Sequence, residues 1–210
     1  MDRTKTLNEA MMYKHTPCNP FSLRPALLAA CASMVLLSGC KSTEFGPLQA
    51  DLSTTQLANQ ASTQQPRLPA QLNVVDMRPQ HHVLRLHYKT EPAQFATFQQ
   101  PLTMIIQQQL APYLADPTNN PLRLQLNIQE GLCVADQTLS RHAMNCRFSV
   151  QVTANQSRGT WTKTYTATRN REGKLKLKPD YVESDMVAIM DTALSHFMND
   201  QDFKDWLTRP

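Results

Sequence analysis

The 210-residue chain is long enough for one ordinary domain with some chain to spare, and its hydrophobic fraction of 41% can supply a core. The charged fraction of 18% is low, and the net charge falls from +4 to +2 without the first 40 residues, which hold four basic and two acidic residues. These values argue against a highly charged disordered chain and do not indicate a nucleic-acid partner.

An uncharged apolar run over residues 26–37 follows Arg24 and leads into Leu-Ser-Gly-Cys at residues 37–40. A basic residue, an apolar stretch and then small residues are the order of a secretory signal. The run is too short for a membrane-spanning helix, which needs about 20 residues. Leu-Ser-Gly-Cys resembles the lipobox of bacterial lipoproteins. The resemblance implies a signal peptide over 1–39 and a Cys40 that carries a diacylglycerol and a further acyl chain such as palmitate, enough for stable anchoring.

Two details refine this targeting segment. The stretch before the apolar run is long and contains acidic Glu9, so Met11 and Met12 are alternative starts to the first residue. The residue after Cys40 is Lys41, whereas an Asp there resembles an inner-membrane retention signal. We therefore expect an outer-membrane lipoprotein whose domain faces the periplasm.

Residues 41–70 are rich in Ser, Thr, Gln and Ala, and their apolar residues are sparse and non-periodic. This composition is typical of a flexible tether. We assign residues 40–70 to the lipidated cysteine and its tether, and 71–210 to a folded periplasmic domain. The alternative is that Leu48–Leu57 docks on the domain as an extra strand or short helix.

The first half of the domain predicts two strands and a helix. A short strand begins near Leu72 and ends near Arg78, and alternating polar and apolar residues over 81–88 predict a second. Pro101 begins a helix. Its apolar residues share one face at a spacing of three to four: Leu102, Ile105, Ile106, Leu110 and Tyr113.

The second half predicts three strands, over 122–134, 145–154 and 160–168, and then a last helix from near Asp180 or Ser184. The apolar stripe of that helix contains Val187, Met190, Leu194 and Phe197. The order β-β-α-β-β-β-α predicts an α+β two-layer domain, with a mainly antiparallel sheet and two helices on one face.

Cys133 and Cys146 remain once the other three cysteines are removed with the signal or used for lipid. They lie near the facing ends of two consecutive strands, where an antiparallel hairpin can place them opposite each other. We predict a structural disulfide in the oxidising periplasm, which would add about 3 kcal/mol at most. The alternatives are a zinc site with His142, which lacks a fourth ligand, and a redox pair.

Three histidines raise the possibility of a metal site. In a strand, His81 and His87 point to one face and His82 to the other, so the three do not converge easily. The segment also lacks any known ligand spacing. We interpret them as solvent-facing side chains and expect no metal.

No catalytic constellation stands out. Ser140 and His142, with Asp136 nearby, lie in a polar loop but two residues apart, which is no nucleophile arrangement, and no GxSxG elbow is present. The 5 glycines form no phosphate-binding loop. We expect no catalytic residue, no cofactor and no enzymatic activity.

Lys174, Lys176 and Lys178 alternate with Leu175 and Leu177, which predicts an edge strand. Lysine on an edge strand commonly prevents strand-to-strand aggregation. The alternative is a contact with anionic lipid headgroups or with a glycan.

Several segments of the domain follow one another in a definite order and spacing. After the Leu-Ser-Gly-Cys start, these are Val75-Asp76-Met77-Arg78, the helix Leu102–Leu114, Arg147, Tyr165, Ala167, Glu172-Gly173, Asn199-Asp200, Phe203 and Trp206-Leu207. In this order and spacing, from about Leu72 to Leu207, the chain resembles the YajG-like family of uncharacterised bacterial lipoproteins. The resemblance implies an α+β envelope domain without known catalysis, and the cysteine pair and the histidines are not among the features that carry it.

These features together predict a non-enzymatic lipoprotein, anchored to the membrane by lipid, that binds another envelope protein or a glycan through its periplasmic domain. One alternative is an auxiliary lipoprotein of an envelope lipid-transport system. Another is a peptidoglycan-modifying or other periplasmic hydrolase. The sequence indicates neither the partner's identity nor an oligomeric state.

Overall fold

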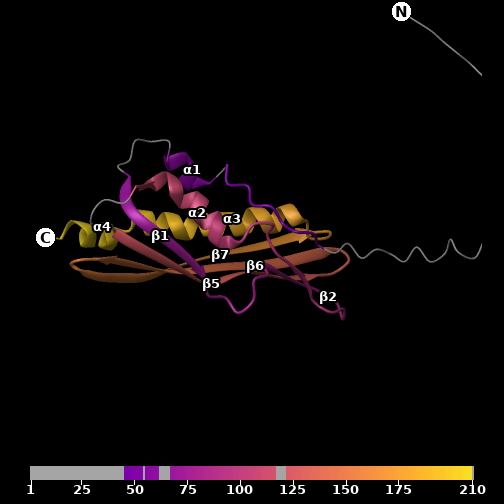
Figure 1. Ribbon diagram of the computed structural model, residues 1–210. Coiled ribbons are helices and arrows are strands. Elements are labelled where there is room, and N and C mark those ends of the chain that lie inside the picture. The colour runs from indigo at the N-terminus through magenta and orange to yellow at the C-terminus, as the bar shows by residue number, and fades with distance from the viewer. Residues whose placement is uncertain (1–44, 54, 62–66, 117–121, 210) are drawn as a thin grey trace, which may run out of the picture. The chain divides into compact units, whose positions relative to one another are not determined.

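The structure is a computed structural model that describes residues 45–209 except 54, 62–66 and 117–121 (Figure 1). The predicted signal peptide and Cys40 lie outside the described residues. The elements in chain order are α1 (Gln56–Ala61), β1 (Leu68–Asp76), β2 (Leu84–Tyr88), β3 (Gln94–Ala96), α2 (Leu102–Leu110), the 3-10 helix η2 (Ala111–Tyr113), β4 (Leu114–Ala115), β5 (Leu122–Gln137), β6 (Arg141–Gln156), β7 (Gly159–Lys174), α3 (Pro179–Asn199) and α4 (Gln201–Thr208).

Three antiparallel strands of 16 residues each, β5, β6 and β7, form the long part of the sheet, with β7 at its edge. They are the three strands predicted from the sequence, and each is longer than expected. Alternate side chains of a strand point to one face, so the apolar residues of β5 and β6 gather on the side that the helices cover. These are Leu122, Leu124, Leu126, Ile128, Met144, Phe148, Val150 and Val152.

The first two strands, β1 and β2, both run parallel to β5 and share its other edge. β1 pairs with residues 122–128, and β2 pairs with residues 133–137, so they follow one another along β5. β4 and β3 extend β1 and β2 outward. The predicted α+β class is confirmed, and the sheet is more mixed in direction than expected because alternation carries no information on strand direction.

The helices lie on one side of the sheet (Figure 1). α3 packs across β6 and β7 and places its apolar stripe against them, α2 packs on β1, and α1 packs on α3. The opposite face of β7 presents a row of exposed hydroxyls, from Thr162, Thr164, Thr166 and Thr168. None of the described helices combines the length and the apolar character needed to cross a membrane.

The folded part of the chain begins earlier than the predicted boundary at Gln71, which lies inside β1. Leu48 and Leu57 are both buried in the core. Leu48 forms an isolated bridge with Phe98: its N–H donates to the carbonyl of Thr97, and its carbonyl accepts from the N–H of Gln99. Of the two predicted alternatives for this segment, the structure has the docked one.

Polar contacts hold the docked segment along α3. The buried Asp191 carboxylate accepts the N–H groups of Gln56 and Leu57, at 2.8 and 3.1 Å, and so satisfies the first donors of α1. Glu183 accepts the N–H of Gln49 at 2.7 Å. Because Gln49 meets Glu183 and Gln56 meets Asp191, the segment runs in the same direction as α3.

Candidate functional site

One end of the long sheet brings together the predicted lysines and two exposed leucines. We call this end the tip and define it as the β5–β6 turn, residues 137–141, with the β7–α3 loop, residues 174–178. Strand register joins the two: Arg141 pairs with Lys174, the last residue of β7. The end of β2 is also here, since Tyr88 pairs with Gln137.

The lysine segment is a loop and not the predicted edge strand. Lys174 ends β7, and Lys178 directly precedes the first residue of α3. Leu175 has a φ of 69°, in the left-handed region, which breaks the extended alternation of the segment. Lys174, Lys176 and Lys178 are all exposed to solvent, while Leu177 is buried.

Three polar contacts fix the loop against the β5–β6 turn. The N–H of Leu175 donates to the carbonyl of Ser140 at 2.8 Å, and the N–H of Leu177 donates to Oε1 of Gln137 at 2.7 Å. Nδ1 of His142 lies 3.1 Å from the carbonyl oxygen of Leu175. The loop is therefore held in one place, yet the side chains of Leu139 and Leu175 remain 67% and 70% exposed.

His142 is a buried residue of β6, whereas the sequence suggested a polar loop around it. Its ring lies directly over Gly173, where an added Cβ would come within 2.5 Å of Cε1. The sequence does contain a signal for this burial, because His142 falls on the same alternate positions as the buried Met144, Cys146 and Phe148. His142 thus positions the lysine loop, and Ser140 and Asp136 do not join it in a nucleophile arrangement.

A recess of about 930 Å³ opens beside the tip. Its lining mixes both signs of charge, with His87, Lys89, Asp136, Arg141, Glu172 and Lys174. The described residues contain no group of three His, Cys, Asp or Glu side chains that could hold a metal ion.

Cys133 and Cys146 lie directly opposite each other in β5 and β6, and the structure joins them by a disulfide. Both cysteines are fully buried. With their sulfur atoms bonded to each other, neither supplies a thiolate for a zinc site with His142. In this structure the pair links the two strands of the β5–β6 hairpin.

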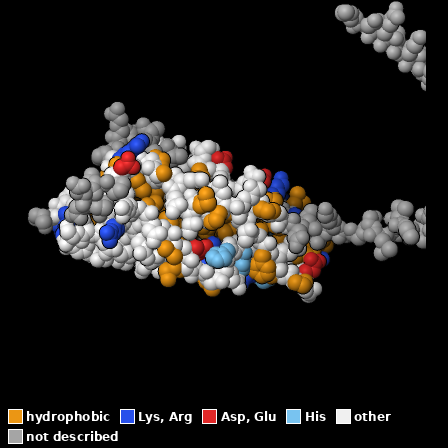
Figure 2. All heavy atoms as spheres, in the orientation of Figure 1, with side chains coloured by type: hydrophobic (Ala, Val, Ile, Leu, Met, Phe, Trp, Pro, Cys, Tyr) orange, Lys and Arg blue, Asp and Glu red, His pale blue; other side chains and the backbone are white. Residues whose placement is uncertain are grey.

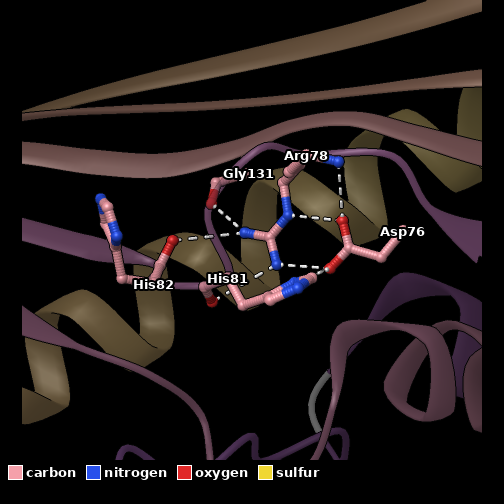
Figure 3. A network of polar contacts seen from close by, with 5 residues as sticks. All are labelled: Asp76, Arg78, His81, His82 and Gly131. Carbon is pink, nitrogen blue, oxygen red and sulfur yellow. Dashed lines mark hydrogen bonds and ion pairs between the residues drawn. The ribbon is translucent and has the colours of Figure 1, made fainter.

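A second polar cluster surrounds Arg78, near the end of β1 (Figure 3). The guanidinium donates to both carboxylate oxygens of Asp76, at 2.9 and 2.8 Å, and to the carbonyl of Gly131 at 2.7 Å. His81 also reaches Asp76, with Nδ1 3.1 Å from Oδ2. The ring of His82 points away from Arg78 and packs on Phe95 instead, with ring centroids 4.6 Å apart.

The Arg78 cluster has a structural role, because its hydrogen bonds connect Asp76 of β1 to Gly131 of β5. Burial raises the pKa of Asp76, but hydrogen bonds from Arg78 and His81 outweigh burial and hold that pKa below its ordinary value. His81 and His82 precede β2 and their rings diverge, so they do not act as a ligand pair. His87 lies in β2 and lines the tip recess, away from both.

Comparison with known proteins identifies the family of the chain. A family model described as uncharacterised lipoprotein matches residues 55–208. A crystal structure of a Xanthomonas campestris protein of family model DUF330 aligns with a TM-score of 0.41 and 12% identity, over 78% of this chain and 99% of that one. A second crystal structure, of an uncharacterised protein, gives a TM-score of 0.32 and 9% identity, over 64% and 95%. Curated proteins give no match. The chain belongs to the family of uncharacterised, YajG-like lipoproteins.

Proposed function

We propose that this protein is an outer-membrane lipoprotein, anchored through Cys40, whose periplasmic domain binds another envelope component without catalysing a reaction. Membership of a lipoprotein family supports a lipid-anchored location in the envelope. Leu-Ser-Gly-Cys at residues 37–40 supplies the residue to be lipidated, and Lys41 in place of Asp supports the outer membrane.

The observation that carries the proposal is the short distance in sequence between Cys40 and the fold. Among the described residues, Phe45 is the first that packs on the core, and it lies five residues after Cys40. Five extended residues span at most about 17 Å. An anchor at Cys40 would therefore hold the domain at the membrane surface, where it would meet membrane-associated partners.

Three buried carboxylates of the domain form contacts that hold the fold together, so they are not free to act as catalytic groups. This favours a binding role over a catalytic one. Asp185 is paired with Arg169 and Arg171 at 2.9 and 2.6 Å. Asp191 holds the start of α1, and Asp200 is paired with Lys163 at 2.7 Å. The broad surface left for a partner is the uncovered, threonine-bearing face of β7.

The test is the Cys40→Ser variant in the native host, with Cys31→Ser in the signal segment as the matched control. We expect the wild type and the control to incorporate labelled palmitate and to fractionate with the outer membrane. We expect the Cys40→Ser variant to lose both properties. A photo-crosslinker at Thr164 should capture a recurrent envelope component from the wild type and from the control. Identical fractionation and crosslinking by the Cys40→Ser variant would contradict the proposal.

A further inference from the structure

We propose that the tip is a membrane-contacting device. Leu139 and Leu175 insert into the interface of the bilayer that carries the lipid of Cys40, and the basic side chains around them contact its anionic headgroups. This inference rests on the proposed lipidation of Cys40 and adds an orientation to it: the long sheet stands with its tip on the membrane.

The described part of the chain starts at the tip end of the domain. Gln49 meets Glu183, which lies five residues after Lys178, and α3 rises about 1.5 Å per residue. Because the docked segment runs in the same direction as α3, the residues before Gln49 lead back toward the first turn of that helix. In Figure 1 the indigo start of the described chain lies at the same end as the loop that joins β7 to α3.

The short linker between Cys40 and Phe45 determines which end of the domain can reach the membrane. A chain of five residues cannot carry the anchor more than about 17 Å from Phe45. The opposite end of the sheet lies much farther away: Trp161 precedes Lys174 by 13 residues in β7, or about 43 Å of strand. An anchor at Cys40 therefore brings the tip within reach of the bilayer and leaves the opposite end in the periplasm.

The two leucines have the character of an interfacial contact. They project from adjacent loops, since the N–H of Leu175 donates to the carbonyl of Ser140, the residue after Leu139. Leu175 combines a left-handed backbone with 70% exposure. The contacts of its backbone with Ser140 and His142 hold this conformation, which turns the Leu175 side chain out to solvent. Insertion into the boundary of headgroups and acyl chains would remove both leucines from water.

Charge at the tip complements an anionic surface. The two loops contain Arg141, Lys174, Lys176 and Lys178 and no acidic residue. The nearest acids of the hairpin, Asp136 and Glu172, lie on a strand row set back by about 7 Å from the row of Arg141 and Lys174. Figure 2 shows hydrophobic and charged side chains interspersed along one face of the molecule. Apolar side chains ringed by lysine and arginine suit a lipid interface better than a purely electrostatic contact.

The experiment uses the lipidated protein in vesicles of phosphatidylethanolamine and phosphatidylglycerol with brominated acyl chains, which quench nearby tryptophan. Leu139→Trp and Leu175→Trp each place a probe at the tip. Met77→Trp is the matched control, because Met77 is also exposed, at 63%, but lies far from the tip. Its N–H donates to the carbonyl of Ile128, which precedes Gln137 by nine residues, or about 30 Å, along β5. The native Trp161 and Trp206 report on the opposite end.

We expect quenching of the probes at 139 and 175, and none at 77 or in the wild type. Replacing Lys174, Lys176 and Lys178 with Gln should weaken tip binding on the order of a hundredfold, at about fivefold per lysine, and so abolish the quenching. Vesicle flotation separates the two proposals: a chain that fails to float lacks the anchor and contradicts the proposed function. A chain that floats without quenching at 139 and 175, or with quenching at 77 or of the native tryptophans, overturns the membrane-contacting tip.

Discussion

The two ends of the β5–β7 sheet both carry apolar and charged side chains, but the apolar ones are covered at one end and exposed at the other. At the end far from the tip, the rings of Trp161, Phe197 and Trp206 surround Phe203, with centroids 5.0, 5.0 and 6.3 Å from its own. Asp200 accepts the N–H of Phe203 and so begins α4. At the tip, apolar side chains stand beside cationic ones with no described element over them.

The difference between the ends comes from coverage and not from composition. α4 folds back over the far end because Asp200 ends α3 and caps the next helix. The β7–α3 loop at the tip is equally well fixed by hydrogen bonds, yet its backbone turns Leu175 outward. A fixed loop with an exposed leucine is what distinguishes a contact surface from a frayed end.

The largest expected effect separates the two ends by stability. Phe203→Ala removes a buried ring from the aromatic cluster and should lower the free energy of unfolding by about 3–5 kcal/mol. Leu175→Ala removes an exposed side chain and should change it by less than about 0.5 kcal/mol. Urea denaturation measures both. A comparable loss in the two variants would mean that Leu175 contributes to the core.

Gly173→Ala probes how closely the tip is packed. The added methyl would meet the buried ring of His142 at 2.5 Å, so we expect a loss of about 2 kcal/mol in the free energy of unfolding. Gly46→Ala is the control, because nothing lies within 4 Å of the Cβ position there. If the two substitutions proved equally harmless in denaturant, His142 would not hold the loop in place.

Asp191→Ala tests the docking that shortens the linker. Its carboxylate holds the first N–H groups of α1, so the variant should lose about 1–2 kcal/mol and become cleavable by protease between residues 45 and 61. Asp205→Ala, an exposed position of α4, should do neither. Unchanged protease resistance in the Asp191 variant would show that other contacts keep the segment in place.

The pH dependence of the far end follows from Asp200. Burial raises its pKa, but hydrogen bonds from Lys163 and Tyr165 outweigh burial and hold the pKa below its ordinary value of 3.8. Burial and the bond to Asp200 also raise the pKa of Tyr165 well above its usual range. A depressed carboxyl pKa stabilises the fold above the unfolded pKa, and this contribution is lost as pH falls through the folded pKa.

Asp200→Asn should therefore be less stable than the wild type by about 1 kcal/mol at pH 7, with the difference shrinking below about pH 3.8. Denaturant melts at pH 7 and pH 3 measure this change. Asp202→Asn, the exposed partner of Lys163, is the control and should have less than half that effect. If the difference in stability stayed constant with pH, the ionised carboxylate of Asp200 would not be the source of the stabilisation.

The three long strands were predictable because most of β5, β6 and β7 alternates between buried and exposed residues, and the last helix was predictable because the apolar stripe of α3 follows helical spacing. The docked segment was not, since its fully buried leucines, Leu48 and Leu57, show no periodicity. The hydrogen bonds that its backbone makes with Glu183 and Asp191 also leave no pattern in the sequence.

The same limit applies to the tip. Alternation over residues 174–178 predicted an edge strand, but the left-handed backbone of Leu175 depends on partners from another hairpin, Ser140 and His142. The lysines were identified as a possible anionic-surface contact. The exposed leucines were not, because exposure depends on which elements fail to cover them.

The most direct test of the central claim is amide hydrogen exchange of the native lipidated protein, with and without anionic vesicles. The account predicts slower exchange on vesicle addition in the two tip loops, residues 137–141 and 174–178, where the N–H of Leu175 is a natural reporter. Exchange in the β6–β7 turn and in α4 should stay the same. Slowing confined to α4 and the β6–β7 turn, or absent from the tip, would contradict it.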